Sequence, residues 1–360
     1  MTALGEISNW QLSAKHRYLR ATVIDTAITM PRSTLSAHPV TRPDSYPGCH
    51  ARRMEQTKHT IPFDRSLLAP RLWPAWLAVG LLRLVALLPF RAKIAAGSAL
   101  GFISYYLLQH RRHVVDTNVA LCFPELTGAK KRKLIKGIFR ENGIGFFEIA
   151  WAWWARPDDL LNRFDVEGLD ILHAAQKKGG VLLIGAHFTH LDLIGLMVNT
   201  FADIDAIYRR NNNPVFEYIV TRGRQKVFKN VIARSDMRRV IRKLREGRVV
   251  WYSPDQDHGH KHSVFAPFFG IAAATVIAGS RLLQLGRATP VFIYHYRDPA
   301  TRRYRIEFHA PTQTMPSGDE QTDARIINSM IERGIRQQPE QYMWVHRRFK
   351  TRPEGQPRLY

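Results

Sequence analysis

The sequence predicts an α/β fold, with a mixed or largely parallel sheet flanked by helices and an N-terminal helical segment that anchors the chain to a membrane. Short apolar runs typical of buried strands alternate with segments of helical periodicity over most of the chain. Two long apolar stretches precede this alternation. Hydrophobic residues make up 45% and charged residues 23% of the chain, which argues against a wholly disordered protein and a multi-span transporter.

Residues 1–53 differ from the rest of the chain. They carry scattered Ser, Thr, His and Pro and show no sustained apolar period. They also lack the positively charged start and apolar run of a secretory signal. We interpret this segment as disordered, or as an extension translated from an upstream start codon, with Met54 as the alternative first residue. A weakly patterned folded segment is the other interpretation.

Residues 62–112 are expected to form membrane-anchoring helices. Residues 72–90 are almost uniformly apolar and approach the roughly 20 residues needed to cross a bilayer core. Arg83 lies in the middle, and a second apolar stretch at residues 94–108 is followed by the basic cluster 110–113. The pattern fits one true span or a pair of helices lying in the membrane interface. A buried core helix of a soluble protein is the third interpretation.

Residues 113–360 are expected to form the α/β domain. A long helical pattern begins at Thr127. Strands are then expected at residues 181–184, 206–208, 249–252, 291–294 and 304–308. Helices are expected around residues 189–199, 214–229, 236–246, 273–286 and 321–337. This alternation indicates a sheet that is covered by helices on both faces.

The chain is strongly basic, with 53 Lys and Arg residues, 30 Asp and Glu residues and a net charge of +23. Such a surface suits an anionic membrane, an acidic protein, a phosphorylated substrate or nucleic acid. Because no zinc-finger spacing, aromatic RNA-binding signature or long basic block is present, we expect no nucleic-acid partner. The two cysteines, Cys49 and Cys122, are too few for a disulfide framework or a four-thiolate zinc site.

The main candidate for catalysis is His187, which follows the apolar run ending at Gly185. This places it at the carboxyl end of a strand, where open α/β sheets hold their reactive groups. Asp192, five residues later, is expected to bring its carboxylate to the imidazole, fix its tautomer and leave the other nitrogen free to accept a proton. His190 is a weaker candidate because it lies on another face of the helix. A helix-capping role is the non-catalytic interpretation of His187.

Polar residues also follow the neighbouring strands. Asp255 and Asp257 come directly after the strand at 249–252, so they are expected to reach the same sheet edge as His187. Metal binding by these acids is an alternative, although their spacing matches no known calcium or zinc pattern. Arg209 and Arg224 are placed to offer cations to an anion at this edge, with solvated surface charge as the alternative.

The sequence contains a candidate base but no evident nucleophile. Phosphate loops, dinucleotide fingerprints and the nucleophile elbow of hydrolases are all missing from it. We therefore expect no cofactor and no metal. A base without a protein nucleophile suits direct transfer of a group to a hydroxyl that the substrate supplies.

Six blocks of sequence resemble the late acyltransferases of lipid A biosynthesis, especially the lauroyl transferases of Gram-negative inner membranes. The resemblance runs from about residue 62 to residue 360, and its most specific part is the long block at residues 339–354. The blocks lie at residues 121–125, 187–192, 208–214, 251–255, 263–269 and 339–354. The resemblance implies an α/β acyltransferase domain similar to that of glycerol-phosphate acyltransferases.

This resemblance also implies partners and roles. The donor would be an acyl carrier protein thioester, and laurate is the expected chain, with hydroxylaurate, myristate and palmitoleate as alternatives. The acceptor would be a Kdo-bearing lipid A precursor, and the catalytic domain would lie on the cytoplasmic side of the anionic inner membrane. His187 and Asp192 would form the catalytic dyad, although relatives in this subgroup often carry Glu in place of Asp192. Arg209, Arg224 and Asp255 would bind substrate or stabilise the oxyanion.

Two other functions fit the same features. One is a basic, membrane-associated binding protein without catalysis, and the other is an acyltransferase that acts on a different membrane lipid. Because His187 lies at a strand end together with later acidic and basic residues, we favour the enzyme.

Overall fold

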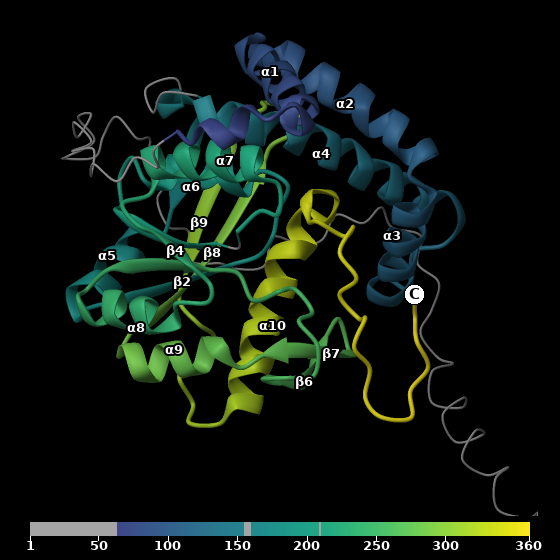
Figure 1. The fold of residues 1–360 in the computed structure, drawn as a ribbon. Coiled ribbons are helices and arrows are strands. Elements are labelled where there is room, and N and C mark those ends of the chain that lie inside the picture. Colours follow the sequence, from purple (N-terminus) through teal and green to yellow (C-terminus); the bar gives the residue numbers. More distant parts are fainter. Residues whose placement is uncertain (1–62, 155–159, 209) are drawn as a thin grey trace, which may run out of the picture. The chain divides into compact units, whose positions relative to one another are not determined.

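The computed structural model describes residues 63–154, 160–208 and 210–360, which all lie in one compact unit, Pro39–Tyr360 (Figure 1). The extension predicted at residues 1–53 lies outside the described residues. The helices are α1 Trp73–Leu87, α2 Phe90–Leu107, α3 Gln109–Cys122, α4 Gly128–Trp154, α5 Leu169–Lys178, α6 Leu191–Val198, α7 Pro214–Val227, α8 Met237–Arg245, α9 Ala278–Gly286 and α10 Glu320–Gln337. The strands are β1 Phe164–Glu167, β2 Val181–Gly185, β3 Ile204–Tyr208, β4 Val231–Ala233, β5 Val249–Tyr252, β6 Ser263–Phe268, β7 Ile271–Val276, β8 Thr289–Arg297 and β9 Tyr304–His309.

Seven strands form one sheet in the order β1-β9-β8-β2-β5-β3-β4. All neighbouring pairs are parallel except β8 and β9, which are antiparallel. The chain passes from β2 to one side of the sheet for β3, β4 and β5, and then to the other side for β8 and β9. This reversal beside β2 is a topological switch point, where sheets of this kind leave room for a site. The predicted α/β fold with a mixed, largely parallel sheet is confirmed.

Strand β2 shows why the sheet is covered on both faces. Val181 and Leu183 pack into a core shared with α5 and α6, whereas Leu182 and Ile184 pack into a core shared with α8, α9 and α10. All four side chains are fully buried. A continuous apolar run is therefore the sequence pattern that this two-faced burial requires.

The N-terminal helices pack on the α/β domain. Helix α2 lies so close to α4 that a Cβ added at Gly143 would come within 2.2 Å of the Gly97 carbonyl oxygen. Helix α1 buries Ala75 and Val79 against Val215 and its neighbours at the start of α7. By length and composition, one helical stretch among the described residues can cross a membrane, Pro70–Leu87, and only 11% of it is buried.

Some element boundaries differ from the prediction. The helix expected at 273–286 begins only at Ala278, because the residues before it form β7, which pairs with β6 in an antiparallel hairpin. The hairpin turn, Phe269–Gly270, has positive φ at both residues, as a type I′ turn requires. The boundary expected between 112 and 113 falls inside α3.

Candidate active site

The site is built where β2 and β5 end side by side. These strands are parallel neighbours, and Ile184 of β2 is paired with Tyr252 of β5. His187 and Asp255 each lie three residues beyond that pair. Equal offsets on adjacent parallel strands bring the two side chains to the same point of the carboxyl edge, so the strand register itself positions the pair.

Asp255 holds His187 by two hydrogen bonds. Its Oδ1 lies 2.6 Å from the ring Nδ1, and its Oδ2 accepts the backbone N–H of His187 at 2.9 Å. The carboxylate is almost completely buried, with 1% of its side chain exposed, whereas the imidazole is 24% exposed. The ring is therefore fixed on its inner side, and its Nε2 is the nitrogen that remains to exchange a proton.

Electrostatics reinforce this pair. Burial by itself would lower the pKa of His187, but the charge and hydrogen bond of Asp255 outweigh burial and raise it. Burial would likewise raise the pKa of Asp255, but His187 lowers it to about 2. Asp255 is thus ionised throughout the physiological range and stabilises an imidazolium beside it.

Asp192 makes a different contact from the one predicted. Instead of bonding to His187, it accepts hydrogen bonds from Nε and Nη2 of Arg224 at 3.1 and 2.8 Å. Asp192 lies in the first turn of α6, where it meets the guanidinium that α7 presents, and the place beside His187 is taken by Asp255 from the adjacent strand. The charge of Asp192 still favours the protonated imidazole. The prediction that the Asp192 carboxylate accepts a hydrogen bond from His187 is therefore corrected, while both residues belong to one cluster.

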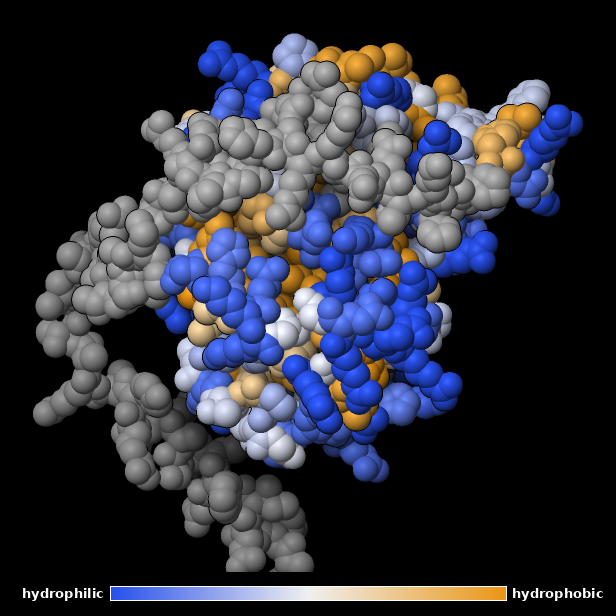
Figure 2. All heavy atoms as spheres, turned by 90° about the vertical axis from the view of Figure 1, so that its left-hand side faces the viewer, coloured by the Kyte–Doolittle hydropathy of each residue, from blue (hydrophilic) through white to orange (hydrophobic). Residues whose placement is uncertain are grey.

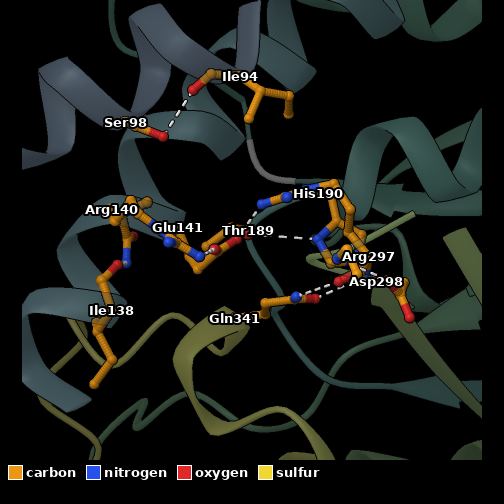
Figure 3. A network of polar contacts seen from close by, with 12 residues as sticks. Ile94, Ser98, Ile138, Arg140, Glu141, Thr189, His190, Arg297, Asp298 and Gln341 are labelled. Atoms are coloured by element: carbon orange, nitrogen blue, oxygen red, sulfur yellow. Dashed lines mark hydrogen bonds and ion pairs between the residues drawn. The ribbon is translucent and has the colours of Figure 1, made fainter. Parts of the chain in front are cut away.

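The turn that carries His187 is fixed from behind by residues 341–343. The carbonyl of His187 accepts from the Met343 amide, and the Thr189 amide donates to the Gln341 carbonyl. The side-chain amide of Gln341 in turn makes two hydrogen bonds to the backbone of Arg297, as Figure 3 shows. Helix α4 approaches this turn closely, since a Cβ at Gly145 would lie 2.6 Å from Thr189.

His190 belongs to this supporting layer and is not exposed to substrate. It is fully buried, and its ring packs at 4.9 Å from the ring of His295. Burial, together with the nearby His295 and Arg297, lowers the pKa of His190 well below its usual range. Figure 3 shows His190 beside Arg297 and Thr189. The structure therefore supports the choice of His187 over His190 as the accessible histidine.

The loop after β5 connects the site to the C-terminal segment through three successive residues. Asp255 holds His187, the Gln256 amide lies 3.3 Å from Nε2 of His346, and Asp257 accepts from the backbone and hydroxyl of Thr351. The ring of His346 lies 6.2 Å from that of His187. Sequence reasoning about single residues missed His346, although it lies in the long block at 339–354.

The remaining predicted site residues are placed as follows. Arg224 lies on α7 and is bound to Asp192, whereas Arg209 lies outside the described residues. Asp257 binds Thr351 and the amide of Gly259. Within residues 63–154, 160–208 and 210–360, no three His, Cys, Asp or Glu side chains gather as a metal site would require.

Comparison with known proteins shows the family to which the chain belongs. Residues 60–351 match the model of the bacterial lipid A biosynthesis acyltransferases. The chain belongs to this family. It is 36% identical over 301 residues to the lipid A biosynthesis lauroyltransferase of Escherichia coli strain K12, covering 83% of this chain and 98% of that protein.

Other members of the lipid A acyltransferases differ in the fatty acid that their names state. The lipid A biosynthesis palmitoleoyltransferase of the same organism is also 36% identical, over 83% of this chain and 98% of its own length. The lipid A biosynthesis myristoyltransferase of Escherichia coli strain K12 is 30% identical, over 86% of this chain and 96% of its own length. The predicted family and the predicted acyltransferase activity are thus confirmed, and the identities do not select one acyl chain.

Proposed function

We propose that this lipid A acyltransferase moves a fatty acyl chain, laurate in the first instance, from acyl carrier protein to a hydroxyl of a Kdo-bearing lipid A precursor, with His187 as the general base. The observation that carries the proposal is the contact between His187 and Asp255 at the carboxyl edge of the sheet. It fixes the Nδ1 side of the ring and leaves Nε2 as the proton acceptor.

In the proposed reaction, Nε2 of His187 removes the proton from the acceptor hydroxyl as its oxygen attacks the thioester carbonyl. A carbon–oxygen bond forms, and the carbonyl oxygen becomes an oxyanion. When the carbon–sulfur bond breaks, the imidazolium returns its proton to the leaving thiolate. Asp255 stabilises the imidazolium between these two steps, which is the role its buried negative charge suits.

Arg224 is the proposed stabiliser of the oxyanion. The amides of His187, Phe188 and Thr189 all donate to acceptors within the protein, so these three do not form a backbone oxyanion hole. Arg224 brings a cation close enough to oppose protonation of His187. Asp192 binds Nε and Nη2 of this guanidinium and thereby positions it, which leaves Nη1 without a hydrogen-bond partner among the described residues.

We further propose that the protein is held at the anionic cytoplasmic face of the inner membrane by α1 and α2. Apart from Leu285, the large hydrophobic side chains that are exposed among the described residues lie between Phe63 and Leu108 or at Phe146. Figure 2 shows hydrophobic residues along the edge that α1 and α2 form. Helix α1 belongs to the stretch Pro70–Leu87, which is long and apolar enough to cross a membrane. Its opposite face packs on α7, and this favours a position in the interface.

The test of the proposed function is transfer by the purified protein in detergent. It would be incubated with a lipid A precursor and, separately, with lauroyl, hydroxylauroyl, myristoyl and palmitoleoyl thioesters of acyl carrier protein, and the product lipid would be weighed by mass spectrometry. We expect the laurate product to form fastest and to vanish with His187→Ala. Equal transfer by His187→Ala would contradict the proposed base, and a faster reaction with another thioester would replace laurate.

A further inference from the structure

A basic cavity lies beside the C-terminal segment, and none of its lining residues takes part in the proposed acyl transfer. Its volume is about 420 Å³, and residues 347–360 form most of its wall, with His260 on the other side. Arg347, Lys350, Arg352 and Arg358 all line it. Its described lining residues include no Asp or Glu side chain. Four guanidinium or ammonium groups around one small volume make it strongly attractive to an anion.

No ion pair to Asp or Glu neutralises these positive charges among the residues that the structure describes. Lys350 and Arg358 have no ion pair to a carboxylate in the part of the chain that the structure describes. Arg352 donates to the Ala272 carbonyl and to the Gln356 amide oxygen, and Arg347 lies 2.8 Å from the imidazole of His110. All of these partners are uncharged acceptors. An internal structural role would have supplied acids, so the arrangement points to an anion from outside.

The cavity is joined to the active site by the loop after β5. Asp257, two residues after the carboxylate that holds His187, binds Thr351 in the wall of the cavity. In the same loop, burial and Arg234 lower the pKa of His258, and the charges of His187 and Lys350 add smaller effects in the same direction. A group bound in the cavity is therefore attached to the segments that position the catalytic pair.

The cavity also adjoins the apolar edge of the molecule. Arg347 contacts His110, and Arg111 donates to the carbonyl of Val345. These two residues of α3 lie two and three positions after Leu108, which is exposed together with Leu107. An exposed apolar surface beside a cationic cavity matches a ligand with hydrocarbon chains and an anionic head group.

We propose that this cavity binds the anionic head group of the acceptor lipid through its phosphate or carboxylate groups. The proposal rests on the proposed function, because it assumes a lipid acceptor at His187. Arginine is suited to such groups because its planar fork donates two parallel hydrogen bonds to one phosphate or carboxylate. An acidic carrier protein is the competing source of negative charge. A concave site of this volume with an apolar margin suits a sugar head group better than the convex surface of a folded protein.

The experiment compares two double variants that each remove two positive charges. Lys350→Gln with Arg358→Gln alters the cavity, and Lys177→Gln with Arg325→Gln removes two exposed charges from α5 and α10. The KM for the acceptor, the KM for the acyl carrier protein thioester and thermal unfolding would be measured for both. We expect the cavity variant to raise the acceptor KM about tenfold or more, since each tenfold change reflects the loss of about one charge-assisted hydrogen bond. The carrier KM and the unfolding temperature should match those of the control variant.

A second acceptor lipid shows whether the cavity binds the phosphate groups or the carboxylate groups of the head group. With a chemically dephosphorylated acceptor, the difference between the two variants should shrink if the cavity holds phosphate and persist if it holds carboxylate. An increase in carrier KM alone, or equal effects of both variants, would overturn the proposal.

Binding tests the cavity without relying on transfer. If the wild-type protein transfers no acyl chain from any thioester, the proposed function fails, but co-sedimentation with vesicles that contain the phosphorylated acceptor still measures head-group binding. Vesicles of the same lipids without the acceptor are the reference. If the Lys350→Gln, Arg358→Gln variant binds these acceptor vesicles as strongly as the wild type does, the proposed head-group site is overturned.

Discussion

One carboxylate, that of Asp255, fixes both the backbone and the ring of His187. Oδ2 accepts the His187 amide at 2.9 Å while Oδ1 meets Nδ1 at 2.6 Å. The two contacts make the position of the imidazole and its tautomer depend on the same group. In Asp255→Asn, the single amide oxygen would be drawn to the backbone N–H, which leaves an NH₂ group facing Nδ1. The proton would then move to Nε2, where a general base needs a free lone pair.

The pH profile should show the influence of this pair. Only the neutral imidazole accepts a proton, and Asp255 raises the pKa of His187 above its ordinary value of about 6.5. The initial rate should therefore rise with pH through a midpoint above that value. Asp255→Asn removes the negative charge, so the midpoint should move to lower pH while the plateau falls. Initial rates of acyl transfer measured between pH 5 and 9 would check this, and an unmoved midpoint in the variant would disprove the electrostatic link.

Asp192 and Arg224 should act as a unit. If Asp192 serves to position the guanidinium, Asp192→Asn should slow transfer in the wild-type background but add little once Arg224→Gln is present. The loss from Arg224→Gln should be about 10²–10³-fold in kcat, as for a residue that stabilises an oxyanion. A double-mutant cycle on kcat should give a coupling free energy of about 1–3 kcal/mol. Additive losses would mean that Asp192 acts independently of Arg224.

His190→Ala should affect stability more than chemistry. The side chain is fully buried against His295, so its removal leaves a cavity and should lower the free energy of unfolding by about 2–4 kcal/mol. Activity per folded molecule should stay within a few-fold of the wild type. Thermal unfolding and the initial rate, normalised to folded protein, would be measured together. A stable variant without activity would instead give His190 a chemical role.

The apolar edge can be tested with matched substitutions of exposed leucines. Leu84 on α1 lies in the surface proposed to meet the membrane, whereas Leu285 on α9 is also exposed but lies elsewhere. Leu84→Glu should weaken binding to vesicles of inner-membrane composition about tenfold or more, because it replaces a leucine that enters the lipid with a charged side chain. Leu285→Glu should bind like the wild type. Equal binding by both variants, measured by flotation, would show that α1 does not enter the membrane.

Much of the fold could be predicted because the strands of the central sheet are continuous apolar runs. The expected strand at 181–184 and the observed β2 differ by one residue. The hairpin of β6 and β7 was not predicted, because the small apolar residues 272–274 fit a helix as well as a strand. Pairing with β6 decided their conformation, and pairing is a tertiary effect that local propensity does not contain.

The candidate site could likewise be predicted as far as local sequence patterns reach, but not where it depends on the pairing of distant strands. That His187 and Asp255 lie at strand ends follows from the sequence pattern alone. Which carboxylate bonds to the imidazole depends on the pairing of β2 with β5, and residues 181–184 lie far from residues 249–252 in the chain. The nearer acid, Asp192, was therefore preferred. His346 and the basic cavity come from a segment without periodic structure after α10, where no hydrophobic pattern indicates position.

The most direct test of the account is the initial rate of acyl transfer by Asp255→Asn and Asp192→Asn, compared at equal amounts of folded protein. Both substitutions keep the side-chain volume and remove one negative charge, so they differ only in the contact they disturb. We predict that Asp255→Asn loses about 10²–10⁴-fold in rate, as for loss of a general base, and that Asp192→Asn retains at least ten times more activity than Asp255→Asn. Near-normal transfer by Asp255→Asn together with an inactive Asp192→Asn would contradict the assignment of Asp255 as the partner of His187.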